Sequence, residues 1–104
     1  MRELTCDVAV IGAGTAGLAA YDAATKAGAR AVVIERGPGG TTCARVGCMP
    51  SKLLIEAARA AHDARHAGVF GVEAGEVRVD GAAVMRRVRA LRDDFVASVL
   101  DGLD

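Results

Sequence analysis

The sequence predicts an α/β fold: a strand, a helix and a second strand form a βαβ unit with a parallel sheet, and helices follow it. Two short apolar runs, at residues 6–11 and 31–35, flank an alanine-rich segment of residues 18–26. Apolar runs of this length are typical of strands, whereas the alanine-rich segment favours a helix. Gly28 follows at the position where a left-handed residue commonly ends a helix. Because helices cover parallel sheets on both sides, we expect the first strand to be buried on both faces.

A loop and two further helices are expected after the second strand. Residues 36–42 contain three glycines and a proline, which favours a loop. Residues 51–66 are rich in Leu, Ala, Glu and Arg and predict a helix, and residues 68–75 predict irregular structure or a short strand. Asp80 is placed to cap a last helix. The apolar residues of that helix recur at three- and four-residue steps and predict one stripe: Val84, Val88, Leu91, Phe95 and Val99.

Composition excludes several classes of protein. A chain of 104 residues is long enough for one domain with a buried core. Its 13 basic residues balance its 13 acidic residues, which argues against nucleic acid or an anionic membrane as partner. The chain has no apolar run long enough to cross a membrane and no secretory leader, so we expect a cytoplasmic protein. Three cysteines do not form a disulfide scaffold, so any disulfide is expected to be catalytic or redox-sensing.

The number of strands suggests that the predicted domain is incomplete. Doubly wound sheets normally have five or six strands, and only two are expected here. We therefore expect residues 1–104 to be the N-terminal portion of a longer domain. The alternative is a 104-residue protein that dimerises or exchanges elements between two copies.

A glycine motif follows the first predicted strand. Gly12, Gly14 and Gly17 have the Gly-x-Gly-x-x-Gly spacing, and a predicted helix follows them. In this context the glycines permit a tight turn, close approach of a pyrophosphate and close packing of helix on strand. Glu35 ends the second strand, 23 residues after Gly12, where a carboxylate accepts hydrogen bonds from a ribose. The alternative is a glycine-rich turn beside a surface glutamate.

Two cysteines five residues apart form the most informative motif. In one regular helix Cys43 and Cys48 would point about 140° apart and be separated by roughly 7.5 Å along the axis. A disulfide needs Cα atoms within about 7 Å, so Cys43 is expected in a loop or a distorted turn, with Gly47 relaxing the backbone. Pro50 is tolerated in a first helical turn. Cys48 is therefore expected at a helix N-terminus, where the helix dipole stabilises a thiolate.

These motifs together resemble the flavin disulfide reductases, the class I pyridine nucleotide-disulfide oxidoreductases. The resemblance spans Val8 to Lys52 and includes the Gly-x-Gly-x-x-Gly motif, the acid after the second strand and Cys43-x-x-x-Gly-Cys48-x-Pro-Ser-Lys52. The Pro-Ser-Lys ending is more similar to the dihydrolipoamide dehydrogenase and mercuric reductase branches than to glutathione reductases. The resemblance implies the start of a Rossmann-like FAD-binding domain. It also implies an oxidoreductase that moves electrons between NAD(H), FAD and a dithiol or disulfide such as lipoamide, and a homodimer at full length.

The resemblance also implies roles for individual residues. Cys43 would be the thiol that exchanges with the substrate, and Cys48 the thiol that contacts the flavin ring. Lys52, one helical turn after Cys48, would lie near the reactive ring nitrogen. The residues implied to bind FAD are Gly12, Gly14 and Gly17 at the pyrophosphate, Glu35 at the adenosine ribose, Arg36, and Thr42, Cys43 and Lys52 along the flavin. The nicotinamide site and an acid–base histidine are expected outside residues 1–104.

The sequence departs from the family pattern at two positions. Thr41 stands where the family usually has the second of two glycines, and Arg45 stands where it usually has Asn. An Arg45 side chain turned inward would add to the stabilisation of a Cys48 thiolate. Two other classes of function are considered: a non-catalytic nucleotide-binding module, and a thiol redox sensor or metal site. Two cysteines without nearby histidines do not complete a four-ligand zinc site, so no metal site is predicted.

Overall fold

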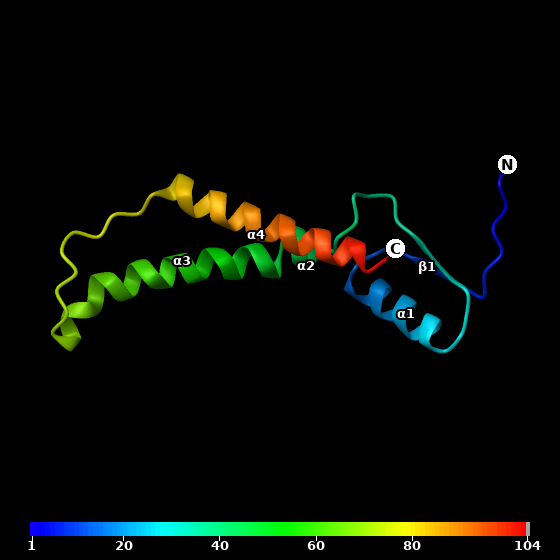
Figure 1. The fold of residues 1–104 in the computed structure, drawn as a ribbon, viewed down its shortest axis with the longest axis horizontal. Coiled ribbons are helices and arrows are strands. Elements are labelled where there is room, and N and C mark those ends of the chain that lie inside the picture. Colours follow the sequence, from blue (N-terminus) through cyan, green and yellow to red (C-terminus); the bar gives the residue numbers. More distant parts are fainter. Residues whose placement is uncertain (104) are drawn as a thin grey trace.

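The computed structural model describes residues 1–103, and it is elongated (Figure 1). Its extents are 67 × 27 × 16 Å and its radius of gyration is 20.5 Å, whereas a compact chain of this length has a radius of gyration of about 13 Å. The accessible surface is 7793 Å², against about 5,500 Å² for a compact protein of this mass. Among the described residues the buried apolar side chains are those of Val10, Ala13, Ala44 and Val88. The expectation of a substantial core was therefore wrong, because the elements form two narrow units placed end to end.

The first unit is the predicted parallel βαβ unit. Strand β1 (Val8–Ile11) pairs with β2 (Ala31–Ile34) in parallel, and helix α1 (Thr15–Lys26) connects them. The pairing continues past β1, where the Gly12 N–H donates to the Ile34 carbonyl over 2.8 Å. Gly28 has a φ of 83°, so it turns the chain back toward β2 in the left-handed conformation that was expected. This α/β arrangement confirms the predicted fold class.

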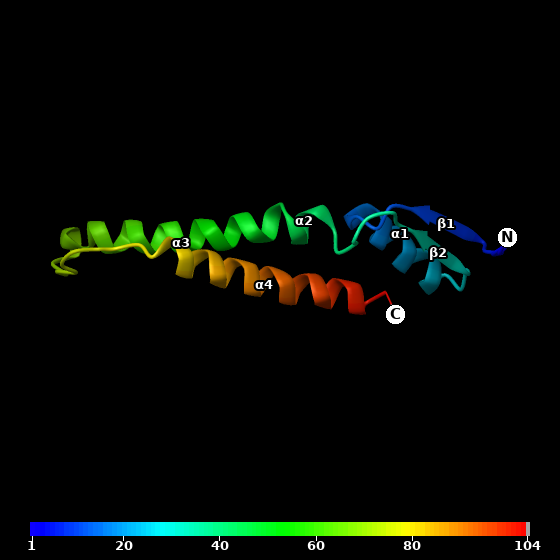
Figure 2. The same ribbon diagram turned by 90° about the horizontal axis from the view of Figure 1, so that it is seen from above.

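The two faces of the sheet differ in exposure. Val10 is 8 % exposed, while the directly paired Ile11 and Ile34 are 86 % and 53 % exposed. Helix α1 packs on one face, and no helix within residues 1–103 covers the face that carries these isoleucines (Figure 2). The prediction of a strand buried on both faces was therefore wrong for this chain, because a two-stranded sheet with one helix has only one covered side.

Helices form the second unit. A short helix α2 (Thr42–Arg45) precedes α3 (Cys48–His66), a 3₁₀ turn η1 (Ala67–Phe70) and α4 (Gly81–Asp101). Helix α3 thus begins three residues before the predicted start. Of the segment 68–75, predicted to be irregular or a short strand, η1 takes the first part and the remainder is irregular. Helices α3 and α4 lie side by side and run in opposite directions (Figures 1 and 2). None of the helices in the described part of the chain is long and apolar enough to cross a membrane.

Helix α4 begins as predicted and buries part of the predicted stripe, since Val84 and Val99 are half-buried. The Asp80 carboxylate accepts a hydrogen bond from the Ala83 N–H over 3.0 Å, which confirms the predicted cap. Val88 is buried, but Leu91 and Phe95 are 39 % and 43 % exposed. The inner face instead includes Val96, against which a Cβ at Gly40 would lie only 2.7 Å away. The buried face of α4 includes Val96 because α4 contacts α2 and the loop at Gly40 as well as α3.

Gly17 sets how closely α1 approaches the end of β1. A Cβ at this position would overlap the carbonyl oxygen of Gly12 and lie 3.3 Å from Cγ1 of Val10. The overlap is with backbone, which cannot move aside as a flexible side chain can. Only glycine therefore allows the helix to start directly above the turn.

We predict that Gly17→Ala lowers the free energy of unfolding by about 1–3 kcal/mol. The cost of overpacking against backbone outweighs the roughly 1 kcal/mol of helix propensity that alanine gains over glycine. Gly14→Ala is the matched control, since a Cβ there meets nothing within 4 Å and Gly14 has a φ of −80°. Chemical denaturation of ligand-free protein measures both variants. Equal unfolding free energies for the two variants would contradict the packing role of Gly17.

Candidate functional site

The glycine loop between β1 and α1 leads into the first turn of α1, and a Cβ at Gly12 or Gly14 would meet nothing within 4 Å. Gly12 has a φ of 97°, a conformation that glycine adopts without strain. Gly14 caps α1, and no side chain accepts a hydrogen bond from the first turn. The N-terminal N–H groups of a helix and the helix dipole attract anions such as phosphate.

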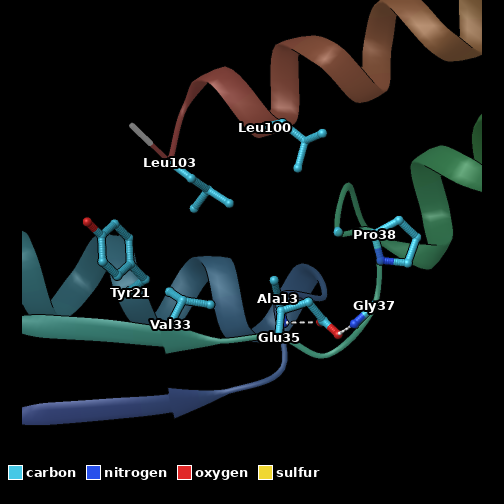
Figure 3. Close-up of a pocket in the computed structure, with 9 residues that line it drawn as sticks. Ala13, Tyr21, Val33, Glu35, Gly37, Pro38, Leu100 and Leu103 are labelled. Carbon is cyan, nitrogen blue, oxygen red and sulfur yellow. Dashed lines mark hydrogen bonds between the residues drawn. The ribbon is translucent and has the colours of Figure 1, made fainter. Parts of the chain in front are cut away.

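The carboxylate of Glu35 joins this loop to the loop after β2. Its Oε2 accepts a hydrogen bond from the Ala13 N–H over 2.8 Å, and its Oε1 accepts one from the Gly37 N–H over 2.8 Å (Figure 3). The Ala13 bond is the main cause that lowers the pKa of Glu35 from its usual value of 4.5, and the Gly37 bond lowers it further. Glu35 is thus held as a carboxylate at the meeting point of the two loops.

Two cavities adjoin Glu35 and form one groove. The larger, of about 390 Å³, lies between the sheet and the end of α4, and Tyr21, Val33, Leu100 and Leu103 line its apolar part (Figure 3). The smaller, of about 170 Å³, is lined by residues of the glycine loop and of α2. Both cavities share the following residues: Ala13, Glu35, Gly37, Pro38 and Gly39. The groove therefore has an apolar end, a carboxylate near its middle and a loop of backbone N–H groups.

Thr41 positions α2 at the far end of the groove. It has a φ of 63° and a ψ of 148°, a region normally reserved for glycine, which costs about 1–3 kcal/mol for other residues. Its Oγ1 accepts a hydrogen bond from the Ala44 N–H over 3.0 Å and so caps α2. The position where the family usually has glycine is therefore one that requires glycine-like geometry, and Thr41 offsets part of the strain with this cap.

Cys43 and Cys48 lie on either side of a break between α2 and α3. Cys43 is in α2 and Cys48 is the first residue of α3, so they do not share one helix, as the spacing predicted. Gly47 forms the break: a Cβ there would lie 3.1 Å from the Thr42 carbonyl oxygen and 3.4 Å from the Cys43 Cα. Its lack of a side chain lets the backbone of α2 fold against the start of α3.

The two thiols interact and have different surroundings. Both are free; Cys43 is half-buried and Cys48 is exposed. A hydrogen bond with the Cys48 side chain is the main cause that raises the pKa of Cys43, and the charge of Lys52 acts in the opposite direction. Cys43 therefore keeps its proton while Cys48 stands at the positive end of a helix of 19 residues.

The structure brings three of the nine predicted site residues to the lining of this groove, while Gly12, Gly17, Cys43 and Cys48 line neither cavity. Gly14 and Thr42 line the smaller cavity, and Glu35 lines both cavities. Arg36 is exposed and lines neither cavity, although its backbone N–H and its charge also lower the pKa of Glu35. Lys52 is exposed on α3 and lines neither cavity, but its charge lowers the pKa of Cys43.

Ten residues that sequence reasoning did not assign to this groove also line it. They are Ala13, Tyr21, Val33, Gly37, Pro38, Gly39, Thr41, Arg45, Leu100 and Leu103. The two leucines reach it because α4 ends beside the sheet, about 65 residues further along the chain than Glu35. No local pattern marks such a contact. Arg45 stood out in the sequence because it replaces the usual asparagine, but the sequence suggested a place beside the thiols and not in the groove.

The residues fit a dinucleotide. The larger cavity lies within the size range of small-ligand sites and has the apolar lining that suits a nucleobase. Each Glu35 oxygen accepts one backbone bond and so retains a lone pair for a ribose hydroxyl. The open backbone at Gly14 accommodates phosphate.

Comparisons with known proteins agree with this arrangement. Residues 6–100 match the protein family described as pyridine nucleotide-disulphide oxidoreductase. The dihydrolipoyl dehydrogenase of Chlamydia muridarum is 38 % identical over 98 residues, which cover 94 % of this chain and 20 % of that protein. The mercuric reductase of Streptomyces lividans is 45 % identical over 80 residues, 76 % of this chain and 17 % of that protein. The chain thus spans about a fifth of the length of these relatives.

We predict that the amide protons of Ala13 and Gly37 titrate together with a midpoint below 4.5, because both donate to the Glu35 carboxylate. Since the folded pKa is lowered, the contribution of Glu35 to stability is complete above that usual value. It is lost as the pH falls through the folded pKa. Amide chemical shifts measured by NMR between pH 2 and 7 test this, with Glu35→Gln as the control in which the titration disappears. A midpoint at or above 4.5 would contradict the bridging role.

Proposed function

This chain belongs to the pyridine nucleotide-disulphide oxidoreductase family, and on that basis we propose that its complete protein is a flavin disulfide oxidoreductase. It would pass two electrons between NAD(H), FAD and a dithiol or disulfide substrate through Cys43 and Cys48. Its βαβ unit is the start of a Rossmann-like FAD-binding domain. Binding of NAD(H) would be the task of residues outside this chain.

One observation carries the proposal: two free cysteines lie on either side of a helix break at one end of a dinucleotide groove. Thr42, the residue before Cys43, lines that groove. A structural cysteine pair has no need of an adjacent nucleotide site. A plain nucleotide-binding module has no need of two free cysteines on either side of a helix break. The combination therefore favours redox chemistry over the non-catalytic alternative.

The sulfur chemistry can be written for the oxidised pair. A substrate thiolate attacks the Cys43 sulfur, which forms a mixed disulfide and releases Cys48 as a thiolate. The second substrate thiol, losing its proton, then attacks the substrate sulfur of the mixed disulfide. The substrate leaves as a disulfide, and Cys43 is released and takes up a proton. The two electrons lost by the substrate now reside on Cys43 and Cys48, and the raised pKa of Cys43 keeps the proton on that sulfur.

FAD would supply the two-electron acceptor for the reduced cysteine pair. Gly12, Gly14 and Gly17 would form the loop at its pyrophosphate, and Glu35 would bind the adenosine ribose. The remaining residues proposed to contact it are Arg36, Thr42, Cys43 and Lys52. Cys48, at the start of α3, would hold the thiolate at the positive end of the helix dipole.

Dihydrolipoamide is the substrate we propose. The Pro50-Ser51-Lys52 ending and the similarity to dihydrolipoyl dehydrogenases support it. A second candidate is mercuric ion, because a pair of thiols binds soft metals and mercuric reductases are 38–52 % identical over the matched residues. A preference for NAD, a homodimeric assembly and a cytoplasmic location stay predictions.

We predict that the two cysteines behave unequally in the complete protein. Cys43→Ser leaves the Cys48 thiolate beside the flavin, so a long-wavelength thiolate-to-flavin absorbance band should be present without reductant. The band should fade on acidification as the thiolate is protonated. Cys48→Ser should lack the band at every pH although flavin still binds. Both variants should lose dithiol-dependent reduction of NAD by at least about 1,000-fold, since either change breaks the electron path.

Cys6→Ser is the control, because Cys6 precedes β1 and lines neither cavity. It should keep both flavin and turnover. A band that survives in Cys48→Ser and vanishes in Cys43→Ser would reverse the two roles. A purified protein that takes up no flavin would overturn the proposed function as a whole.

A further inference from the structure

Arg45 lines the smaller cavity together with Gly14 and Thr42. It occupies the last position of α2, and its side chain is half-buried. A Cβ at Gly40 would lie 3.4 Å from its Cδ and 3.5 Å from its Cγ, so the aliphatic part of Arg45 packs over Gly40. Packing of this part restricts where the guanidinium can lie.

The guanidinium has no carboxylate partner within residues 1–103. The ion pairs of the described chain involve Lys26, Arg59, Arg78 and Arg92. Arg45 also borders a cavity beside Asp93, but that carboxylate already pairs with Arg92 at 2.9 Å. Arg45 is the only Lys or Arg among the described residues that line the smaller cavity. A partly buried cation without a protein partner favours an anion in that cavity.

We propose that Arg45 binds the pyrophosphate of the dinucleotide, opposite the N–H groups of the glycine loop. The inference rests on the proposed function, which puts FAD in this groove. A planar guanidinium donates two parallel hydrogen bonds to phosphate oxygens, whereas the asparagine usual at this position carries no charge. Arg45 would thus neutralise negative charge that the backbone N–H groups alone offset only in part.

This role differs from the stabilisation of a Cys48 thiolate that the sequence suggested for Arg45. Lys52 is the cation whose charge lowers the pKa of Cys43. Arg45 precedes the break at Gly47 and borders the phosphate end of the groove. The two roles make different predictions, because only a phosphate contact depends on the presence of the pyrophosphate in the ligand.

The test uses the complete protein, freed of flavin and titrated calorimetrically with FAD, ADP and adenosine. We expect Arg45→Met, which keeps the aliphatic packing over Gly40, to weaken FAD and ADP by about tenfold. Adenosine, which has no phosphate, should bind the unmodified protein and Arg45→Met with equal affinity. Arg45→Lys should show an intermediate loss, since it restores the charge without the planar donor pair. Arg89→Met is the matched control, because Arg89 is exposed on α4 and lines neither cavity.

The outcomes separate the two proposals. Failure of the unmodified protein to bind FAD would overturn the proposed function. Tight FAD binding by the unmodified protein and by Arg45→Met alike would overturn only the role of Arg45. An equal loss of adenosine and ADP affinity would also overturn it, because it would show that Arg45 merely supports the loop. A shift in the acid sensitivity of the thiolate band without a loss of FAD affinity would assign Arg45 to the thiols instead.

Discussion

The hydrogen bonds from two loops to one carboxylate hold the groove together. The Glu35 carboxylate accepts one hydrogen bond from the Ala13 N–H, in the loop between β1 and α1, and one from the Gly37 N–H, in the loop after β2. Loss of that side chain leaves two backbone N–H groups without protein partners and frees the loops from each other. Both cavities of the groove adjoin Glu35, and residues of α2 and of the end of α4 line them as well. The carboxylate is therefore structural as well as available to a ligand.

A second constraint acts on the cysteines. Thr41 takes a backbone conformation normal for glycine, and Gly47 admits the close approach of α2 to α3. The non-helical backbone at Val46 (φ −137°, ψ 1°) and Gly47 (φ −117°, ψ −112°) interrupts what would otherwise be one helix from residue 42 to residue 66. A continuous helix would separate the thiols, because positions five apart point in different directions. The break is thus the physical reason that Cys43 and Cys48 interact.

The site is assembled on a scaffold with little buried apolar surface. Val88 is the only buried side chain of α4, and Ala44 the only one of α2. The groove combines the first loop, the second loop, α2 and the end of α4, and few apolar contacts hold these parts together. A ligand that contacts all of them therefore contributes to their relative placement, since binding stabilises the arrangement that binds it.

Local patterns in the sequence determined the βαβ unit, the turn at Gly12, the end of α1 before Gly28, the cap at Asp80 and the separation of the two cysteines. Each depends on residues close in sequence, through backbone conformation, caps or helical period. The tertiary structure alone decided the placement of Arg45 in the groove, the arrival of Leu100 and Leu103 beside Tyr21, and the exposure of Ile11 and Ile34. These depend on how elements distant in sequence pack, and hydrophobic burial is non-directional, so a single apolar stripe is compatible with several packing partners.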